Sequence, residues 1–232
     1  MSLFVMAVLT VLLAQLWWLW PALTGASAFF TRDILAFRLP YQARLGAELV
    51  EGRWPAWAPE FGGGMPLWHH PSAENADPLT LLFALLPPHH ANAVSMALHL
   101  VLTTVGMALL CRSLRVHPVL SAWAGLMYAC SGPAASFYTV GFMDVTSLPW
   151  VLLGGRMCAR PSSRARWLVP LVVAYRLLRP DPLMVAASMV LAALVAWSCA
   201  ALGRRRQALV ELALGSCLGA LLAAPFLLPA AA

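Results

Sequence analysis

Side chains that could do chemistry are concentrated in one stretch of the sequence, residues 25–90. Asp33 stands there with two arginines beside it, Arg32 and Arg38. A carboxylate can take a proton from a hydroxyl group as a general base, and a guanidinium can bind two phosphate oxygens at once. Two interpretations follow. Asp33 and the arginines form a site for a hydroxyl and a phosphate, or Asp33 is a solvated loop carboxylate or helix cap and the arginines contact lipid headgroups.

Further along the same stretch lie residue types that ligate metals, namely His69, His70, Glu74 and Asp77. A divalent ion there would suit a phosphate-containing ligand. However, two adjacent histidines do not easily bind one ion from a regular helix, and Asp77 followed by Pro78 fits the start of a short helix. We therefore expect no cofactor, with a divalent metal as the alternative.

Two more ionisable residues lie outside that stretch. Asp144 could supply a second carboxylate to the same site, or it could cap a helix that begins at Val145. His99 lies within an apolar run, and a polar side chain inside a membrane helix is expected to face other helices. We expect His99 to be a hydrogen-bonding partner in helix packing rather than a proton relay.

The elements that must position these residues are membrane helices. Hydrophobic residues make up 61% of the 232-residue chain and charged residues 10%, against about 45–50% and about 25% in soluble domains. This composition excludes an ordinary soluble domain. At about 20 residues per membrane-spanning helix, the number of hydrophobic residues is sufficient for about seven spans. The basic residues form no stripe with interleaved aromatic residues, so we expect no nucleic acid as a partner.

Apolar runs that reach or approach spanning length lie at residues 3–23, 91–110, 119–140, 145–158, 167–178, 183–202 and 208–228. The fifth contains Arg176 and precedes two prolines, so we expect it to be tilted, broken or partly inserted. The predicted fold class is all-α. It is one polytopic transmembrane domain over residues 1–232, with a first span at 3–23, a long loop at 25–90 and the remaining helical spans over 91–229.

The distribution of charge predicts the orientation of these spans. If the Met1 end is cytoplasmic, the inner loops hold nine arginines: Arg112, Arg115, Arg156, Arg160, Arg164, Arg166, Arg204, Arg205 and Arg206. The outer segments then hold eight of the nine acidic residues. This satisfies the positive-inside rule, so we predict that loop 25–90 is extracytoplasmic. A signal peptide cleaved after Ala28 is the alternative for residues 1–28, but the first run is long and lacks a positively charged start, which favours a retained anchor.

Short helices are expected within the long loop. Pro40 fits the first position of a helix, and Tyr41, Leu45 and Leu49 follow at four-residue spacing. We expect this amphipathic helix to lie flat on the membrane. A second apolar piece, residues 79–86, is too short to span a bilayer and should be interfacial or re-entrant.

Several motifs resemble those of the YfhO-like bacterial membrane proteins. They are DILAFRLP at 33–40, GRWPAWAP at 52–59, GGMP at 63–66, PLTLLF at 78–83, LPW at 148–150 and LAAP at 222–225. The resemblance covers nearly all of the chain. Because members of that family are longer, it implies that the chain is an amino-terminal portion of a larger protein.

The resemblance also implies a fold and an activity. YfhO-like proteins are placed among the GT-C glycosyltransferases, which transfer a sugar from a polyprenyl-phosphate carrier to an extracytoplasmic acceptor. For this chain it implies a GT-C-like fold in a bacterial cytoplasmic membrane, with a polyprenyl-phosphate-linked sugar, a cell-envelope acceptor and membrane lipids as partners. The catalytic residue would be Asp33. Contacts to the donor phosphate or the acceptor would come from Arg32, Arg38, His69, His70, Glu74 and Asp144.

The alternative is a non-enzymatic transporter or assembly protein for envelope lipids or glycans. A transporter would be expected to carry charged residues within the membrane, or paired broken helices near its midplane. The sequence offers few such features: His99, Arg176 and the Ser131-Gly132-Pro133 break.

Overall fold

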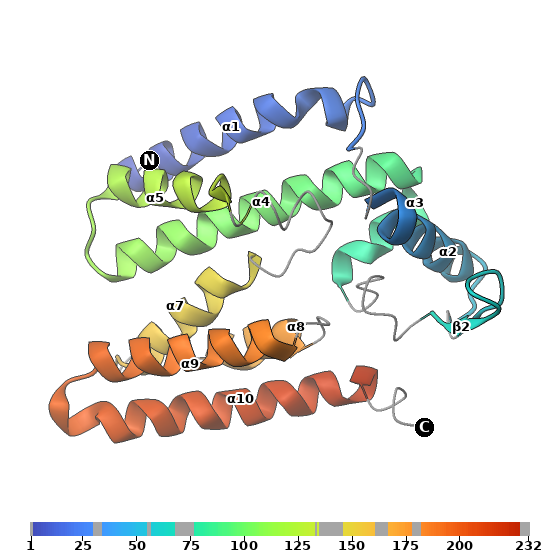
Figure 1. Cartoon of the computed structure of the whole chain (residues 1–232). Helices are drawn as coiled ribbons and strands as arrows, with labels where there is room; N and C mark the ends of the chain where they lie inside the picture. The colour runs from blue at the N-terminus through green and yellow to red at the C-terminus, as the bar shows by residue number, and fades with distance from the viewer. Residues whose placement is uncertain are drawn as a thin grey trace.

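The computed structural model of the chain is a bundle of α-helices with one short β-hairpin. It describes residues 2–29, 34–54, 57–67, 77–132, 134, 146–160, 167–177 and 182–227. Figure 1 shows α1, α4 and α5 packed together as one group and α7, α8, α9 and α10 as another, with α4 in contact with α7 between them. The elements of the long loop gather at one end of α4.

Each of the apolar runs contains a helix. These helices are α1 (Leu3–Leu23), α4 (Pro88–Ser113), α5 (Pro118–Ala129), α7 (Leu148–Cys158), α8 (Leu168–Leu177), α9 (Pro182–Cys199) and α10 (Arg205–Leu227), the last preceded by the 3₁₀ turn η6 (Leu202–Arg204). Within the described residues, three segments are long and apolar enough to cross a membrane, at Leu3–Leu23, Pro88–Ser113 and Leu202–Ala224. The protein is therefore mostly helical with membrane-compatible helices, and the total of seven spans stays a prediction.

The helix of the third apolar run is interrupted near the middle of the run. Its first helix, α5, ends at Ala129, and the chain turns at Cys130. The sequence supplies the reason at Pro133, because a proline lacks a backbone N–H and its ring clashes with the carbonyl four residues earlier, here that of Ala129. The break that the sequence shows at Ser131-Gly132-Pro133 thus interrupts the helix of this run, and a span over 119–140 stays a prediction.

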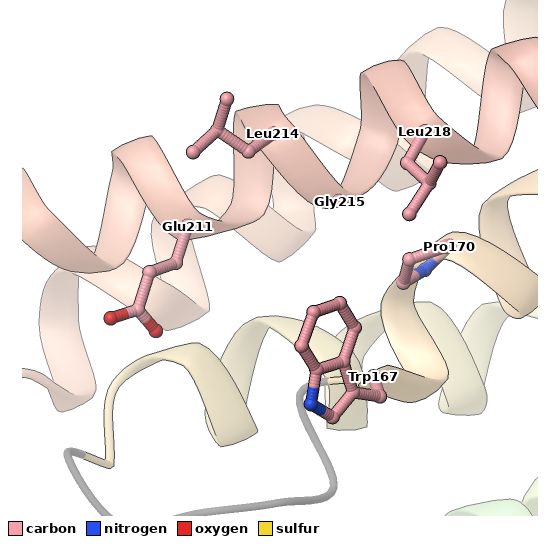
Figure 2. Close-up of a pocket in the computed structure, with 6 residues that line it drawn as sticks. All are labelled: Trp167, Pro170, Glu211, Leu214, Gly215 and Leu218. Carbon is pink, nitrogen blue, oxygen red and sulfur yellow. The ribbon is translucent and has the colours of Figure 1, made fainter.

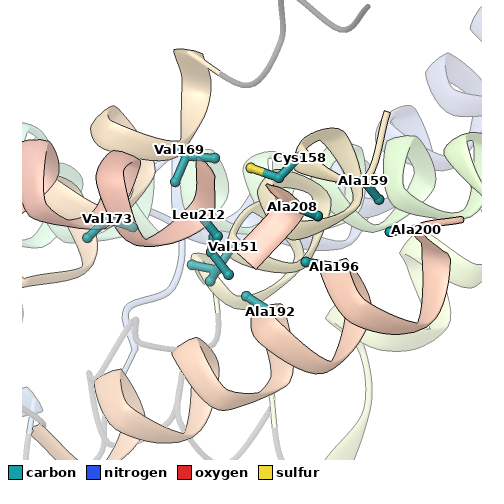
Figure 3. Packing of buried hydrophobic residues seen from close by; sticks show 10 residues of the cluster. All are labelled: Val151, Cys158, Ala159, Val169, Val173, Ala192, Ala196, Ala200, Ala208 and Leu212. Carbon is teal, nitrogen blue, oxygen red and sulfur yellow. The ribbon is translucent and has the colours of Figure 1, made fainter. Parts of the chain in front are cut away.

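The helix groups are held by small side chains and by hydrogen bonds between helices. In the second group, Gly155 of α7 comes so close to α9 that a Cβ atom would lie 2.4 Å from the carbonyl oxygen of Ala192. In the first group, Gln15 of α1 and Thr104 of α4 exchange hydrogen bonds of 2.9 and 3.0 Å. Both devices are typical of membrane helices, since lipid provides no hydrophobic force between them. Figure 3 shows the buried cluster of the second group: Val151, Cys158, Ala159, Val169, Val173, Ala192, Ala196, Ala200, Ala208 and Leu212.

One end of the bundle collects arginines that we predict to be cytoplasmic. The guanidinium carbon of Arg112, near the end of α4, lies 5.8 Å from the centre of the Phe4 ring at the start of α1. Arg156 and Arg160, at the end of α7, both donate to the carbonyl of Ser113. The start of α10 lies at the same end (Figure 1). The described helices therefore alternate in direction as the charge pattern requires.

The long loop folds into short elements. They are the π-helical turn η1 (Ile34–Arg38), α2 (Leu39–Val50), the strands β1 (Trp57–Ala58) and β2 (Met65–Pro66), the 3₁₀ turn η3 (Pro78–Leu81) and α3 (Leu82–Leu85). The amphipathic helix is confirmed as α2, with Pro40 in its first turn. Its apolar face differs from the expectation, because Tyr41 and Leu45 pack against Ala58 and Leu67 in a small core of the loop itself. The hairpin covers the face that we expected to lie on the membrane.

Candidate functional site

A row of polar side chains is buried on α4, where the long loop meets the bundle. Asn92, Ser95, His99 and Thr103 follow one another at three- or four-residue spacing and therefore share one face of the helix. Each of them is at most 2% exposed. Buried polar groups of this kind need hydrogen-bond partners. The loop and α8 supply partners for Asn92, Ser95 and His99, and Thr103 donates to the backbone oxygen of His99 in its own helix. We call these four residues and their partners Arg38, Asp77 and Tyr175 the buried polar cluster.

His99 is the centre of the buried polar cluster. Its Nδ1 lies 2.7 Å from the backbone oxygen of Ser95, and because a carbonyl can only accept, this nitrogen donates. Its Nε2 lies 2.9 Å from Oδ2 of Asp77 and 3.2 Å from the hydroxyl oxygen of Tyr175. The imidazole is thus held at both nitrogens, at Nδ1 by its own helix and at Nε2 by the loop and by α8. The expectation that His99 faces other chain segments and hydrogen-bonds to them is confirmed.

Asp77 has two roles, one of which the sequence predicts. Its Oδ1 accepts the backbone N–H of Leu79 at 3.0 Å, which caps η3 as expected. Its Oδ2 binds His99. His99 lies eleven residues after Pro88, which corresponds to about 16 Å along a helix that rises 1.5 Å per residue. The segment from Asp77 to the start of α4 therefore runs back along the first half of α4, and its position in or on the membrane stays a prediction.

Arg38 ties the first part of the loop to the same face of α4. Its Nε donates to Oδ1 of Asn92 at 3.1 Å and its Nη2 to Oγ of Ser95 at 3.5 Å. The side chain is only 3% exposed. A buried guanidinium is stable only with such partners, so these bonds fix η1 and the start of α2 against the bundle.

Arg38 is the one predicted site residue that the structure describes. Asp33, Arg32, His69, His70, Glu74 and Asp144 lie outside the described residues. Along the chain, Asp33 is five positions before Arg38 and Glu74 is three positions before Asp77. The two loop segments that carry these candidates are thus anchored next to each other on α4. Of the four residues considered for a metal, Asp77 alone is described, and it binds His99.

The sequence analysis did not identify Tyr175 as part of a site. It also did not recognise that the polar residues of α4 form one stripe along the helix. The stripe had a signal, because Asn92, Ser95, His99 and Thr103 recur at helical spacing in an otherwise apolar run. Tyr175 had none, since it is one aromatic residue among the many of the apolar segments.

Two cavities among the described residues involve the C-terminal helices, one of them together with α4. One of about 280 Å³ is lined by Leu102, Thr146, Ser147, Trp150, Leu171, Val172 and Tyr175, so Tyr175 connects its wall to His99. Figure 2 shows the other, of about 220 Å³, lined by Trp167, Pro170, Glu211, Leu214, Gly215 and Leu218. Its charged lining residue, Glu211, accepts a hydrogen bond from Nη2 of Arg204 at 3.2 Å. Both cavities are mainly apolar and suit hydrocarbon better than a sugar.

Ion pairs stabilise the outer part of the loop around Glu48 of α2. Arg53 donates from Nε to Oε2 of Glu48 at 2.7 Å and from Nη2 to Oε1 at 3.2 Å. Arg44 also pairs with Glu48, and its Nε lies 2.9 Å from Oε1 of Glu60. The hydrogen bonds from Arg53 lower the pKa of the Glu48 carboxyl below its usual value, with the charges of Arg44 and Arg53 adding to the effect and burial opposing it. The same contact raises the pKa of Arg53.

The buried polar cluster can hold a proton between a carboxylate, an imidazole and a phenol, and it can fix the loop on the bundle. With His99 0% and Asp77 5% exposed, its direct effect in this conformation is on structure. Comparison of the chain with protein-family models, with curated proteins and with solved structures gives no match.

Proposed function

We propose that the chain forms part of a GT-C-type glycosyltransferase, which transfers a sugar from a polyprenyl-phosphate carrier to a cell-envelope acceptor on the extracytoplasmic face. The observation that supports this proposal best is the anchoring of the long loop. Arg38 binds Asn92 and Ser95, and Asp77 binds His99. Transfer between two bound substrates needs a catalytic group held in a defined position, and both anchors lie within five residues of a candidate, Asp33 or Glu74.

In the proposed reaction Asp33 takes the proton of the acceptor hydroxyl as that oxygen bonds to the anomeric carbon of the sugar. The bond from the anomeric carbon to the phosphate oxygen breaks, and the polyprenyl phosphate leaves with the electron pair. This leaving group needs no protonation, but a cation nearby stabilises its charge. Arg32 is the preferred cation, because the guanidinium of Arg38 already binds Asn92 and Ser95. His69, His70, Glu74 and Asp144 are candidates for contacts to the donor or acceptor.

The test is sugar transfer from a radiolabelled polyprenyl-phosphate sugar in membranes that contain the protein. Asp33→Asn is expected to lower the rate at least about a hundred-fold, since general-base catalysis typically contributes that much. Glu51→Gln is the matched control, because Glu51 is an exposed acid of the same loop. Equal transfer by the wild type and Asp33→Asn would remove Asp33 from the mechanism. Absence of any lipid-dependent transfer by the wild type would contradict the proposed activity.

Transport is the second candidate, and a specific observation favours it. His99 of α4, the longest of the described helices, forms a buried ionisable pair with Asp77, and Arg176 of α8 is 2% exposed. Buried ionisable groups in membrane helices often mark substrate or proton pathways. Counterflow of a substrate without any covalent product, abolished by Asp77→Asn, would support transport over glycosyl transfer.

A further inference from the structure

The arginines at the predicted cytoplasmic end have few counter-charges in the protein. Between Asp77 and Asp144, and again between Asp144 and Asp181, the sequence contains no Asp or Glu. The loops that follow α4 and α7 therefore contain arginines and no acid. After Asp181 the sequence has one more acid, Glu211, and this carboxylate is bound by Arg204.

Two of these arginines converge on one atom. The Nη2 atoms of Arg160 and Arg156 lie 2.7 and 3.4 Å from the backbone oxygen of Ser113, at the last residue of α4. Because both reach the same oxygen, the two guanidinium groups lie within about 6 Å of each other, a distance at which like charges repel clearly outside bulk water. Arg112 joins them at this end of α4 and donates from Nη1 to the backbone oxygen of Val116.

No acid of the loops that follow α4 and α7 balances this charge, because these loops contain none. The carboxyl end of a helix offers roughly half a negative charge, against the guanidinium groups of Arg112, Arg156 and Arg160. The Nε of Arg156 is buried and has no hydrogen-bond partner among the described residues. Each guanidinium also keeps N–H groups that the bonds to Ser113 and Val116 do not use. The arrangement has the positive charge and the free donors of an anion site.

We propose that Arg112, Arg156 and Arg160 bind the phosphate of an anionic membrane lipid at the predicted cytoplasmic end of α4. A guanidinium binds phosphate oxygens with two parallel hydrogen bonds, and basic pockets between membrane helices at this side suit lipid headgroups. The Phe4 ring lies against Arg112, and the chain neighbours of Phe4 and Ser113 include the exposed apolar residues Leu3, 52% exposed, and Leu114, 48% exposed. They provide contacts for acyl chains, which a free phosphate would not use. This site lies at the opposite end of α4 from the long loop and does not depend on the proposed transferase activity.

The test is lipid retention by the purified protein, measured by native mass spectrometry from micelles that contain phosphatidylglycerol or phosphatidylcholine. The wild type is expected to retain phosphatidylglycerol selectively. Arg156→Gln with Arg160→Gln is expected to weaken retention about tenfold or more, because charge-assisted hydrogen bonds are lost. The control, Arg115→Gln with Arg206→Gln, removes the same charge from exposed arginines at the same end and is expected to change retention less than about threefold.

Equal losses of lipid retention in the two double variants would contradict the proposed site, because they would show that the lipid is attracted to positive charge in general. Millimolar inorganic phosphate could also displace the bound phosphatidylglycerol as effectively as added phosphatidylglycerol does. That result would assign the site to a soluble anion instead. Arg160→Lys keeps the charge and loses the two-pronged contact, so it is expected to weaken retention partly. This milder variant decides the question if the double variant does not fold, and unchanged retention by it would contradict the role of Arg160.

Discussion

At the scale of single residues, one imidazole joins three distant parts of the chain. His99 of α4 binds Asp77 of the loop, and it lies within hydrogen-bond distance of Tyr175 of α8. His99 and Asp77 are both buried. If one of the two side chains is removed, the other loses its hydrogen bond and no water takes the place of the missing group. A residue in such a position affects stability through its neighbours as much as through its own contacts.

We predict that His99→Ala lowers the free energy of unfolding by about 2–3 kcal/mol, because Asp77 is left as a buried carboxylate without its partner. His89→Ala is the control, since His89 lies at the start of α4 and is exposed. Thermal unfolding of the detergent-purified variants measures the difference. Equal stability of the two variants would mean that the His99 contact contributes nothing to the fold.

The ion pairs of Glu48 predict a pH dependence of the loop. The pKa of Glu48 is lowered in the folded protein, so its contribution to stability is complete above the pKa of the unfolded chain and is lost as the pH falls through the folded pKa. We expect proteolysis of the loop to accelerate below about pH 4. Glu48→Gln should be cleaved faster at neutral pH and should lose this acid dependence. An unchanged acid dependence in Glu48→Gln would assign the effect to another group.

At the scale of elements, the loop helices depend on each other. α2 has 12 residues and α3 has four, and isolated helices of such length are marginal in water. They are held by close packing, because Gly46 of α2 lies against the backbone of α3. A Cβ atom on Gly46 would be 2.3 Å from the carbonyl oxygen of Phe83. The docking of the first half of the loop on the second therefore requires glycine at this position.

Gly46→Val is accordingly expected to separate α2 from α3 and to lower the unfolding temperature of the protein by several degrees, since overpacking typically costs about 1–3 kcal/mol. Ala47→Val is a matched control in the same helix, because the Ala47 side chain is exposed. Limited proteolysis between residues 50 and 77, compared across both variants, reports on the loop itself. Similar cleavage of the two would show that α2 does not need this contact.

At the scale of the whole molecule, the two ends of the bundle differ in chemistry. Arg156 and Arg160 reach the last residue of α4, and the start of α10 lies at the same end of the bundle (Figure 1). Towards the other end of α1, Trp17, Trp18 and Trp20 are 60–82% exposed, as expected for aromatic side chains near the headgroups of the opposite leaflet. This polarity agrees with a cytoplasmic amino terminus.

The orientation predicts the labelling of introduced cysteines. A cysteine at Glu60 should react with an impermeant thiol reagent in intact cells whose outer membrane, if present, has been made permeable. Arg206→Cys is the internal control, at the opposite end of the bundle, and should react only after the cytoplasmic membrane is disrupted. The reverse pattern would place the long loop in the cytoplasm and would exclude the proposed extracytoplasmic transfer.

Local patterns were sufficient to predict much of this protein. The run of hydrophobic residues predicted α1 with the bounds Leu3–Leu23. Pro40 and the apolar residues that follow it at four-residue spacing predicted α2. Both predictions succeed because these features depend on residues that are neighbours in the sequence. The capping role of Asp77 followed from the same local logic. The interruption after Ala129 was likewise indicated locally, by the Ser131-Gly132-Pro133 break.

Only the tertiary structure decided which distant groups meet. Asp77 and Tyr175 lie 22 and 76 positions from His99, and neither spacing has a meaning in a helix or a loop. The apolar face that contains Tyr41 and Leu45 is a second example. From the sequence alone it suits a membrane surface, but in the structure it is covered by the hairpin that contains Ala58. Hydrophobic periodicity says that a face must be buried, and the partner that buries it is chosen by packing of the whole chain. The sequence by itself determined a membrane-compatible helical protein with one charged end, and the packed structure alone made its scattered polar residues into one buried cluster.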